Sequence, residues 1–186
     1  IAEREPHLLS CLSVDVLPEI KEYERTSTTV INAYLLPVVA RYLQRLESQI
    51  ADAGVRAPLL LMQSNGGLTP AQQAVRLPCN IIESGPAGGV VGAQALASKL
   101  SLSQVISFDM GGTTAKISVI KDGVPATTRE YEVGQVRRFK RGSGYPLQIS
   151  AIELLEIGAG GGSIARLSDL GLLRVGPASA GAEPGP

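Results

Sequence analysis

The residues of this sequence best suited to chemistry are one acid and the glycines and threonines that follow it directly. Asp109 ends an apolar run, and Gly111, Gly112, Thr113 and Thr114 come next. Glycines let successive backbone N–H groups approach an anion closely, and the threonine hydroxyls add donors. Asp109 would repel a phosphate unless a divalent cation or an attacking water lay between them. These residue types indicate a nucleotide-phosphate and magnesium site with Asp109 as its catalytic and metal-binding residue, although an ordinary tight hairpin has the same composition.

A second glycine cluster follows later in the chain, where four of the five residues from 158 to 162 are glycine. Its members are Gly158, Gly160, Gly161 and Gly162. Because successive glycine amides can form an anion-binding nest, these four residues are candidates for binding the cofactor. A substrate loop and a turn that lets two strands cross are the alternatives.

Three polar residues elsewhere have both a chemical and a structural interpretation. Gln63 and Asn65 lie at a Ser-Asn-Gly-Gly turn behind an apolar run, and ligands gather beyond strand ends in α/β folds. They are candidates for hydrogen bonding a substrate carbonyl, although a structural turn is favoured. Glu83 precedes a Gly-Pro helix start. Stabilisation of that helix N-terminus by its charge is favoured over a role as general base or magnesium ligand.

Composition excludes several classes of protein. The 186 residues include 17 basic and 17 acidic ones and carry no net charge, so a nucleic-acid partner is not expected. The basic run 137–141 is interpreted as a solvated loop, with an anion-binding loop as the alternative. A single histidine, His7, excludes a catalytic triad within the chain and a histidine-rich metal site. Cys11 and Cys79 are too few for a disulfide framework, which favours a reducing, cytoplasmic location.

The sequence predicts neither a membrane helix nor a signal peptide. No stretch approaches the roughly 18 consecutive apolar residues that a membrane helix needs. The first residues alternate in charge and no apolar core follows them. The chain begins without Met and stops at Pro186 on no evident structural ending. We therefore expect a piece of a longer protein.

The first half of the chain predicts mainly helix. The hydroxyl-rich segment 26–29 supplies N-cap candidates before an apolar stripe at helical spacing, which Gly54 ends. Pro37 within this stripe predicts a kink or two abutting helices. A strand over 58–63, a tight turn and a short helix follow. The glycines of a last helix, over 83–100, predict that something packs close to it, backbone to backbone.

The second half alternates with a period of two and predicts strands. The candidate strands are 104–110, 115–123 and 124–133, with an Asp-Gly hairpin turn between the last two. Two short strands are expected after the second glycine cluster. We expect part of one domain over 1–186, which consists of a leader (1–25), a mainly helical part (26–103) and a β-rich phosphate-loop part (104–186).

Six blocks of sequence together carry a family resemblance. In order they are EYERTSTTVINAYLLPV, LLLMQSNGGLTP, SGPAGGVVGA, SFDMGGTTAKISVI, EIGAGGGSIA and GLLRVGPASAGAEPGP. The FDMGGTT block resembles the second phosphate loop of the actin-like ATPases. All six are similar to the hydantoinase A and 5-oxoprolinase family, which includes N-methylhydantoinase A subunits and acetone and acetophenone carboxylase subunits. The resemblance implies an α/β fold, a partial ribonuclease H-like (actin-like ATPase) domain.

The resemblance also implies an activity. Such proteins couple ATP, with magnesium or another divalent cation, to the hydrolysis of a cyclic amide or the carboxylation of a ketone. A hydantoinase B-type partner subunit in a hetero-oligomer is implied as well. The segment would contribute one phosphate loop of the nucleotide cleft. We expect the isolated segment to be inactive, because half a cleft supplies no clamp for the transition state.

One position departs from the wider family pattern. Many members have Gly-Gly-Thr-x-Thr-Asp at the loop, whereas Lys116 stands here in place of the final acid. Lys116 cannot accept a proton as Asp does, but it is a candidate for holding an anionic oxygen of the cofactor. Two alternatives remain open at this point: an actin-like phosphotransferase that acts on a small hydroxylated substrate, and a non-catalytic scaffold segment.

Overall fold

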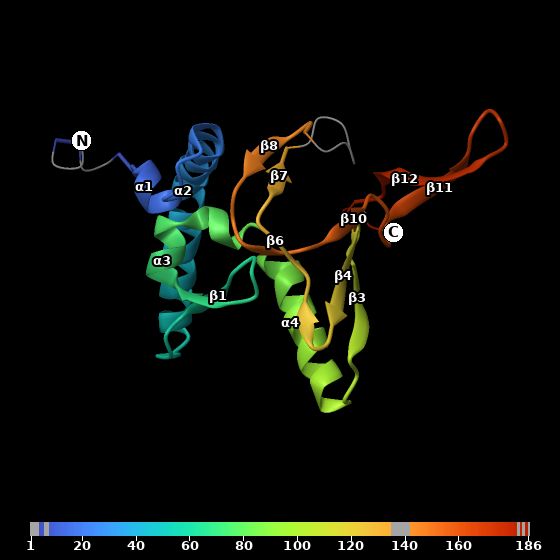
Figure 1. Ribbon diagram of the computed structural model, residues 1–186, viewed down its shortest axis with the longest axis horizontal. Coiled ribbons are helices and arrows are strands. Elements are labelled where there is room, and N and C mark those ends of the chain that lie inside the picture. Colours follow the sequence, from blue (N-terminus) through green and yellow to red (C-terminus); the bar gives the residue numbers. More distant parts are fainter. Residues whose placement is uncertain (1–3, 6–7, 135–141, 182, 184, 186) are drawn as a thin grey trace. The chain divides into compact units, whose positions relative to one another are not determined.

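The computed structural model describes residues 4–5, 8–134, 142–181, 183 and 185. The chain divides into two compact units: unit 1 is Ile1–Ala87 with Thr127–Ala151, and unit 2 is Gly88–Ala126 with Ile152–Pro186. Helices dominate the first half of the chain and strands the second, as Figure 1 shows, which confirms the expected α/β class. His7 and the basic run 137–141 lie outside the described residues. The expected three-part organisation stays a prediction.

The longest element of unit 1 is the helix α2 (Glu22–Asp52). It begins before the expected caps, so the segment 26–29 lies inside the helix. The reason is tertiary: Thr28 is fully buried, and its Oγ1 accepts a hydrogen bond from the N–H of Gln148 at 2.9 Å. Pro37 lies within one continuous helix, which rules out two abutting helices, and the alternative of a kink at Pro37 stays a prediction. The helix ends beside Gly54, whose φ of 78° only glycine adopts easily, as predicted.

The smaller elements of unit 1 surround α2. They are α1 (Ser13–Val16), β1 (Leu60–Met62), β2 (Leu68–Pro70), α3 (Ala71–Arg76), the 3-10 helix η1 (Pro78–Ile81), β6 (Thr127–Thr128), β7 (Tyr131–Val133) and β8 (Tyr145–Leu147). β1 pairs with β2 and β7 with β8, both antiparallel. The predicted strand, tight turn and short helix between residues 58 and 76 are confirmed.

The core of unit 1 joins α2 to segments from both parts of the chain. Cys79, Leu147, Ile149 and Ala151 form one buried cluster. Asn32 of α2 is fully buried beside it and accepts a hydrogen bond from the N–H of Cys79 at 3.3 Å. Burial raises the pKa of the Cys79 thiol to about 11. Both cysteines are free, and Cys79 is the buried structural thiol that its apolar neighbours predicted.

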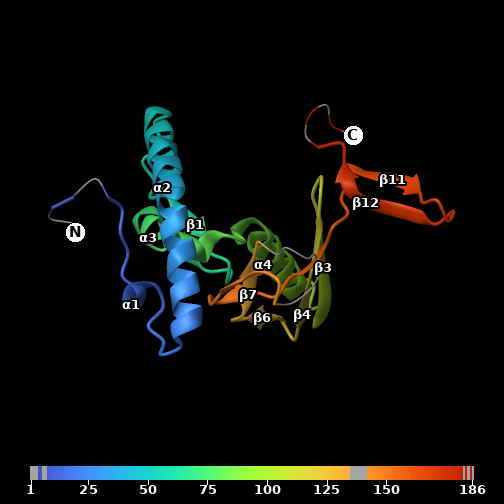
Figure 2. The ribbon, with the colours of Figure 1, turned by 90° about the horizontal axis from the view of Figure 1, so that it is seen from above.

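Unit 2 combines one helix with short antiparallel sheets. Its elements are α4 (Ser84–Lys99, which starts in unit 1), β3 (Gln104–Met110), β4 (Ala115–Lys121), β5 (Val124–Pro125), β10 (Leu155–Ile157), β11 (Ser163–Leu167) and β12 (Leu173–Ser179). The strand order is β10-β4-β3, with β5 also paired to β4. β11 and β12 form a separate hairpin, clearest in Figure 2. β9 (Ala151–Ile152) pairs with β6.

The predicted hairpins of unit 2 are confirmed, but the third strand is not. β3 and β4 pair from Gln104–Lys121 to Met110–Ala115, and Asp122 and Gly123 turn with φ of 52° and 75°. The predicted strand 124–133 instead breaks into β5, β6 and β7. The strand breaks because Pro125 has no N–H to donate to a neighbouring strand. In addition, β10 pairs with the edge of β4 that does not face β3.

The close packing predicted for the α4 glycines is not found at Gly89 or Gly92 among the described residues, and at Gly88 it stays a prediction. Within the described residues, a Cβ on Gly92 would meet no atom within 4 Å, and one on Gly89 would meet only Asp109 Oδ2, at 3.9 Å. α4 instead buries Val90 and Ala97, and Gln94 Nε2 donates to the carbonyl of Gly123 at 2.7 Å. Among the residues that the structure describes, no helix is long and apolar enough to cross a membrane.

Candidate functional site

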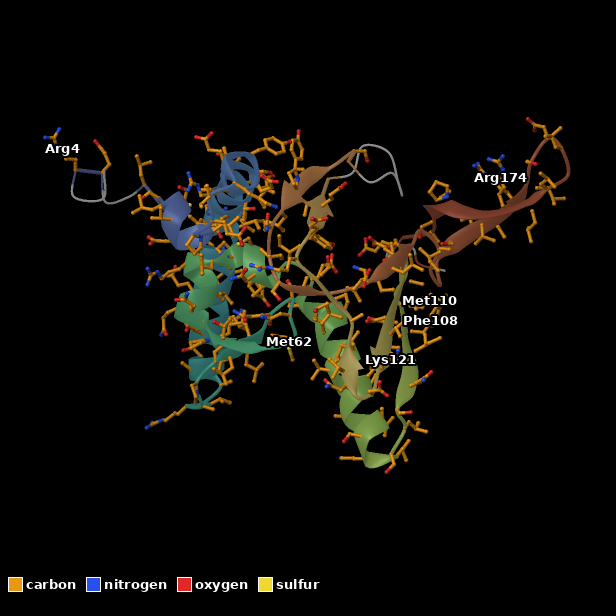
Figure 3. All side chains as sticks on the ribbon, in the orientation of Figure 1. Arg4, Met62, Phe108, Met110, Lys121 and Arg174 are labelled. Carbon is orange, nitrogen blue, oxygen red and sulfur yellow. The ribbon has the colours of Figure 1, made fainter. Side chains whose placement is uncertain are left out.

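The acid and the glycine-threonine residues form the tight turn that joins β3 to β4. Met110 and Ala115 are the last pair of the ladder, and the N–H of Gly111 donates to the carbonyl of Thr114 at 2.9 Å. Asp109 and the first residues of the turn are exposed. Phe108 and Met110, on either side of Asp109, lie toward the end of β3 that leads into the turn (Figure 3). The turn is therefore open to solvent.

The second glycine cluster packs directly on this turn. The N–H of Gly161 donates to the carbonyl of Gly111 at 2.9 Å, and the N–H of Gly162 donates to the carbonyl of Gly112 at 2.8 Å. The carbonyl of Gly162 in turn accepts from Ala180, just beyond β12, at 2.8 Å. We call residues 158–162 the glycine loop. It connects the phosphate-loop candidate to the β11–β12 hairpin.

These two hydrogen bonds decide where the amides of the turn point. In a trans peptide the C=O of one residue and the N–H of the next point in opposite directions. Because the carbonyls of Gly111 and Gly112 point at the glycine loop, the N–H groups of Gly112 and Thr113 point away from it. Within the described chain neither amide has an internal acceptor. A Cβ on Gly112 would meet nothing within 4 Å, so there is space beside these two donors.

Gly160 makes the close approach of the two loops possible. A Cβ at this position would lie 2.5 Å from Gly111 O, 2.7 Å from the carbonyl carbon of Gly112 and 2.7 Å from Thr113 N. Real Cβ contacts with backbone atoms are not this short, so another residue would push the turn away. The N–H of Gly160 donates to Ser163 Oγ at 2.8 Å. The amides of Gly160, Gly161 and Gly162 thus all have internal acceptors.

Gly158 takes part through its carbonyl rather than its amide. A Cβ on Gly176 of β12 would lie only 2.7 Å from Gly158 O. Gly176 also has a φ of 64°, a conformation that favours glycine. The start of the glycine loop is therefore held against β12 by a second glycine-dependent contact.

A row of alternating charges runs across the sheet beside the turn. Lys116 of β4 pairs in register with Asp109 on β3 and with Glu156 on β10, so the three side chains share one face. Lys116 Nζ lies 3.8 Å from Glu156 Oε1. The Lys116 side chain is 18% exposed and that of Glu156 50%, so solvent weakens this ion pair. Lys116 is thus placed next to the acid but is already engaged by a second one.

The polar candidates outside this loop pair belong to unit 1. Glu83 Oε1 accepts a hydrogen bond from the Tyr131 hydroxyl at 2.8 Å, and the N–H of Glu83 donates to Ser64 Oγ at 3.3 Å. These contacts support a structural role for Glu83. Gln63 and Asn65 line a cavity of about 240 Å³.

Sequence reasoning missed the rest of that cavity wall. Asn80, Arg129 and Gln148 line it together with Gln63 and Asn65. These residues come from segments widely separated in sequence. Their only signal is that four of the five are carboxamides, which lie next to strand ends, in a turn or in the 3-10 helix η1. That signal is too common to single them out before the fold is known.

The same fold occurs in solved structures. The crystal structure of the ATP-dependent caprolactamase from Pseudomonas jessenii matches with a TM-score of 0.74 and 39% identity, over all of this chain and 26% of that one. A nucleotide-free structure of acetone carboxylase, an enzyme of ATP-dependent acetone carboxylation, also matches. Its TM-score is 0.73 and its identity 28%, over 91% of this chain and 22% of that one. This chain thus has the same α/β fold as the matching parts of these two enzymes.

Sequence comparison identifies the family. The hydantoinase/oxoprolinase family model matches residues 25–186, and the chain belongs to this family. Caprolactamase subunit alpha from Pseudomonas jessenii is 41% identical over 181 residues, which are 97% of this chain and 25% of that protein. An uncharacterized protein of Methanocaldococcus jannaschii is 48% identical over 185 residues, 95% of this chain and 27% of its own length. The chain therefore spans about a quarter of the length of these relatives.

Proposed function

We propose that this chain supplies one phosphate-binding loop of an ATP-dependent enzyme that hydrolyses a cyclic amide. The observation that carries the proposal is the orientation of the Gly112 and Thr113 amides. Both point away from the glycine loop and have no acceptor within the described chain, and Asp109 lies near the end of the adjoining strand. Adjacent main-chain donors with no internal acceptor suit the oxygens of a polyphosphate. A plain hairpin turn has no need of a second loop to orient them.

The relatives support the choice of reaction. Two similar solved structures are described as ATP-dependent, one a caprolactamase and one an acetone carboxylase. The caprolactamase is the more similar of the two, at 39% against 28% identity. An unactivated amide has a large barrier to hydrolysis. Phosphoryl transfer to its oxygen turns a poor leaving group into a good one. Hydrolysis of a ring amide is therefore our proposal in preference to carboxylation.

Asp109 is proposed as the residue nearest the metal. Among the described residues no group of three or more His, Cys, Asp or Glu side chains lies together. A magnesium ion there would be bound by Asp109 with phosphate and water oxygens, which is the usual arrangement for this cation. The carboxylate of Asp109, exposed on the strand that leads into the turn, fits that donor set. When bound, the ion would neutralise charge on the transferring phosphate.

The remaining residues of the loop pair have separate proposed roles. The amides of Gly112, Thr113 and Thr114 would donate to phosphate, with the threonine hydroxyls as further donors. The glycine loop would hold the turn in place rather than touch the nucleotide, because the amides of residues 160–162 are used internally. Lys116 would add positive charge beside Asp109, which attracts the anionic nucleotide even without direct contact.

We also propose a partner. Caprolactamase, the relative with 41% identity, is named as an alpha subunit, which fits a hetero-oligomer. The expected companion is a hydantoinase B-type subunit. Its presence matters for any assay, because this chain would supply only one wall of the nucleotide cleft.

The test uses the full-length protein with its partner subunit and a coupled ATPase assay against caprolactam, hydantoin and 5-oxoproline. Asp109→Asn keeps the size of the side chain but removes the charge that binds a cation. We expect substrate-dependent ATP turnover to fall by about 10²-fold or more, the scale seen when a preorganised electrostatic group is lost. Asp169→Asn, at an exposed position in the same unit, is the matched control and should retain normal turnover. Equal turnover by the two variants would refute the assignment of Asp109 to the nucleotide site.

A further inference from the structure

Unit 1 contains a polar cavity whose lining includes no residue of the phosphate loop. Its volume is about 240 Å³. Four carboxamide side chains line it, and they are Gln63, Asn65, Asn80 and Gln148. Val16, Leu17 and Ile149 supply an apolar part of the wall, and Leu17 and Ile149 are each only 7% exposed. Clusters of carboxamides are unusual on a wall that serves packing alone, because each brings a donor and an acceptor to be satisfied.

The elements that hold these carboxamides are fixed by hydrogen bonds. The turn between β1 and β2 is shaped by Asn65 Oδ1, which accepts from the N–H of Gly67 at 2.8 Å. The carbonyl of Asn80 accepts from both the N–H and the hydroxyl of Ser64, at 2.8 and 2.9 Å. The backbone of Gln148 is held by the buried hydroxyl of Thr28. A wall fixed in this way loses little entropy when it binds a ligand.

Their internal contacts leave groups of both polarities for a ligand. The Oδ1 of Asn65 is used by Gly67, so its NH₂ group is the remaining donor. The Nε2 of Gln148 donates to Glu19 Oε2 at 3.0 Å, so its carbonyl is the remaining acceptor. Within the described chain, the side-chain amide of Gln63 has no hydrogen-bond partner, so it offers one donor and one acceptor. The cavity can therefore pair with a C=O and an N–H at the same time.

The charges around the cavity favour a neutral ligand. Among the described residues that line it, Arg129 is the one ionic group, and its Nη2 lies 2.9 Å from Glu19 Oε1. This guanidinium already has a carboxylate partner, so an anionic ligand would compete with Glu19. A cationic ligand would face Arg129 itself. The volume lies below the range of about 300–1,000 Å³ for drug-sized ligands, which points to a small ring.

We infer that this cavity binds a small neutral ring that carries adjacent C=O and N–H groups, a lactam or a cyclic imide. The amide edge would pair with Gln63, Asn65 and Gln148, and the ring carbons would contact Leu17 and Ile149. The inference rests on the proposed function only in its choice of ligand class. It assigns substrate recognition to unit 1, whereas the phosphate loop lies in unit 2.

The test is a binding experiment on the full-length protein with its partner subunit. Isothermal calorimetry would compare caprolactam and hydantoin with γ-butyrolactone and cyclopentanone, rings that lack the N–H. Gln63→Leu removes a donor and an acceptor from the wall, and Gln63→Glu keeps the shape but replaces the NH₂ donor. We expect the Kd of the amide rings to rise about tenfold in either variant, the effect of about one hydrogen bond. Gln73→Leu, on the exposed side of α3, is the matched control and should leave the Kd unchanged.

The outcomes separate this inference from the proposed function. Binding of an ATP analogue is measured in the same preparations, and we expect both Gln63 variants to retain it, which also shows that they are folded. Unchanged lactam affinity in the Gln63 variants would overturn the inference while the phosphate loop stands. Equal affinity for the lactone and the lactam, or no binding of either amide ring by the wild-type protein, would also overturn it. Wild-type protein that binds the lactam but not the ATP analogue would contradict the proposed function and leave this inference standing.

Discussion

Gly160→Ala tests how the glycine loop controls the phosphate loop. The added Cβ would lie 2.5 Å from Gly111 O and 2.7 Å from Thr113 N, whereas real Cβ contacts stay beyond about 3.0 Å. The turn must therefore retreat by roughly half an ångström, the difference between 2.5 and 3.0 Å. Overpacking of this kind costs about 1–3 kcal/mol of stability. The retreat also misplaces the two amides that we assign to phosphate.

The expected loss of nucleotide affinity follows from those two amides. A hydrogen bond to a charged group contributes about 1.5–3 kcal/mol, and each 1.4 kcal/mol is a factor of ten. If displacement removes the value of about one such bond, the Kd of an ATP analogue rises between about tenfold and a hundredfold. Calorimetry on the full-length protein with its partner measures this change, and thermal unfolding measures the loss of stability.

Two further glycines make the comparison decisive. Gly112→Ala adds a methyl group on the open side of the turn, where nothing lies within 4 Å, so we expect unchanged stability but weaker nucleotide binding. Gly92→Ala, in α4, also meets nothing within 4 Å. It should raise stability by about 0.5–1 kcal/mol and leave binding unchanged. If Gly160→Ala and Gly112→Ala both bound nucleotide normally, our account of the turn as a phosphate loop would be refuted.

Two other predictions follow from charge and burial. Lys116→Met removes the cation between Asp109 and Glu156; we expect the Kd of an ATP analogue to rise about threefold to tenfold, with the melting temperature nearly unchanged because the ion pair is partly exposed. Equal affinity in a titration would contradict that role. The pKa of the Cys79 thiol is raised from 9.0 to about 11, so the unfolded thiol ionises first as pH rises. Stability should fall by about 3 kcal/mol between pH 9 and 11 and show no contribution from Cys79 below pH 9. Melting curves of Cys79→Ala should lack this extra loss.

Local sequence patterns predicted the elements around the site well. The alternation from Gln104 to Met110 gave β3 with its observed bounds, and the Asp122-Gly123 pair gave the turn with two positive φ values. Both depend on neighbours in sequence only. The predictions failed where distant residues intervene. α2 starts before its expected caps because Thr28 is engaged by Gln148, 120 residues away.

The same division holds for the site. The sequence singled out Asp109 and both glycine clusters as candidates, and the resemblance of six blocks indicated the family that the comparison then showed. It could not say that the second cluster packs on the first, because the contact joins residues about fifty positions apart. It therefore left the glycine loop equally open to binding and to structure. The expected close packing is not found at Gly89 or Gly92 of α4 for a related reason, since a small side chain permits contact but does not create it.

The sequence by itself determined which residues can donate to an anion, where the chain turns, and to which family it belongs. The first two follow from residue chemistry and short-range backbone preferences, which each segment carries wherever it is placed. The family follows from the resemblance of six blocks of sequence. Only the tertiary structure decided that the carbonyls of Gly111 and Gly112 accept hydrogen bonds from the glycine loop, so that two N–H groups point away from that loop. It also decided that carboxamides from separate segments share one cavity. The physical reason is that a peptide group has a direction, and only contacts with distant parts of the chain fix it.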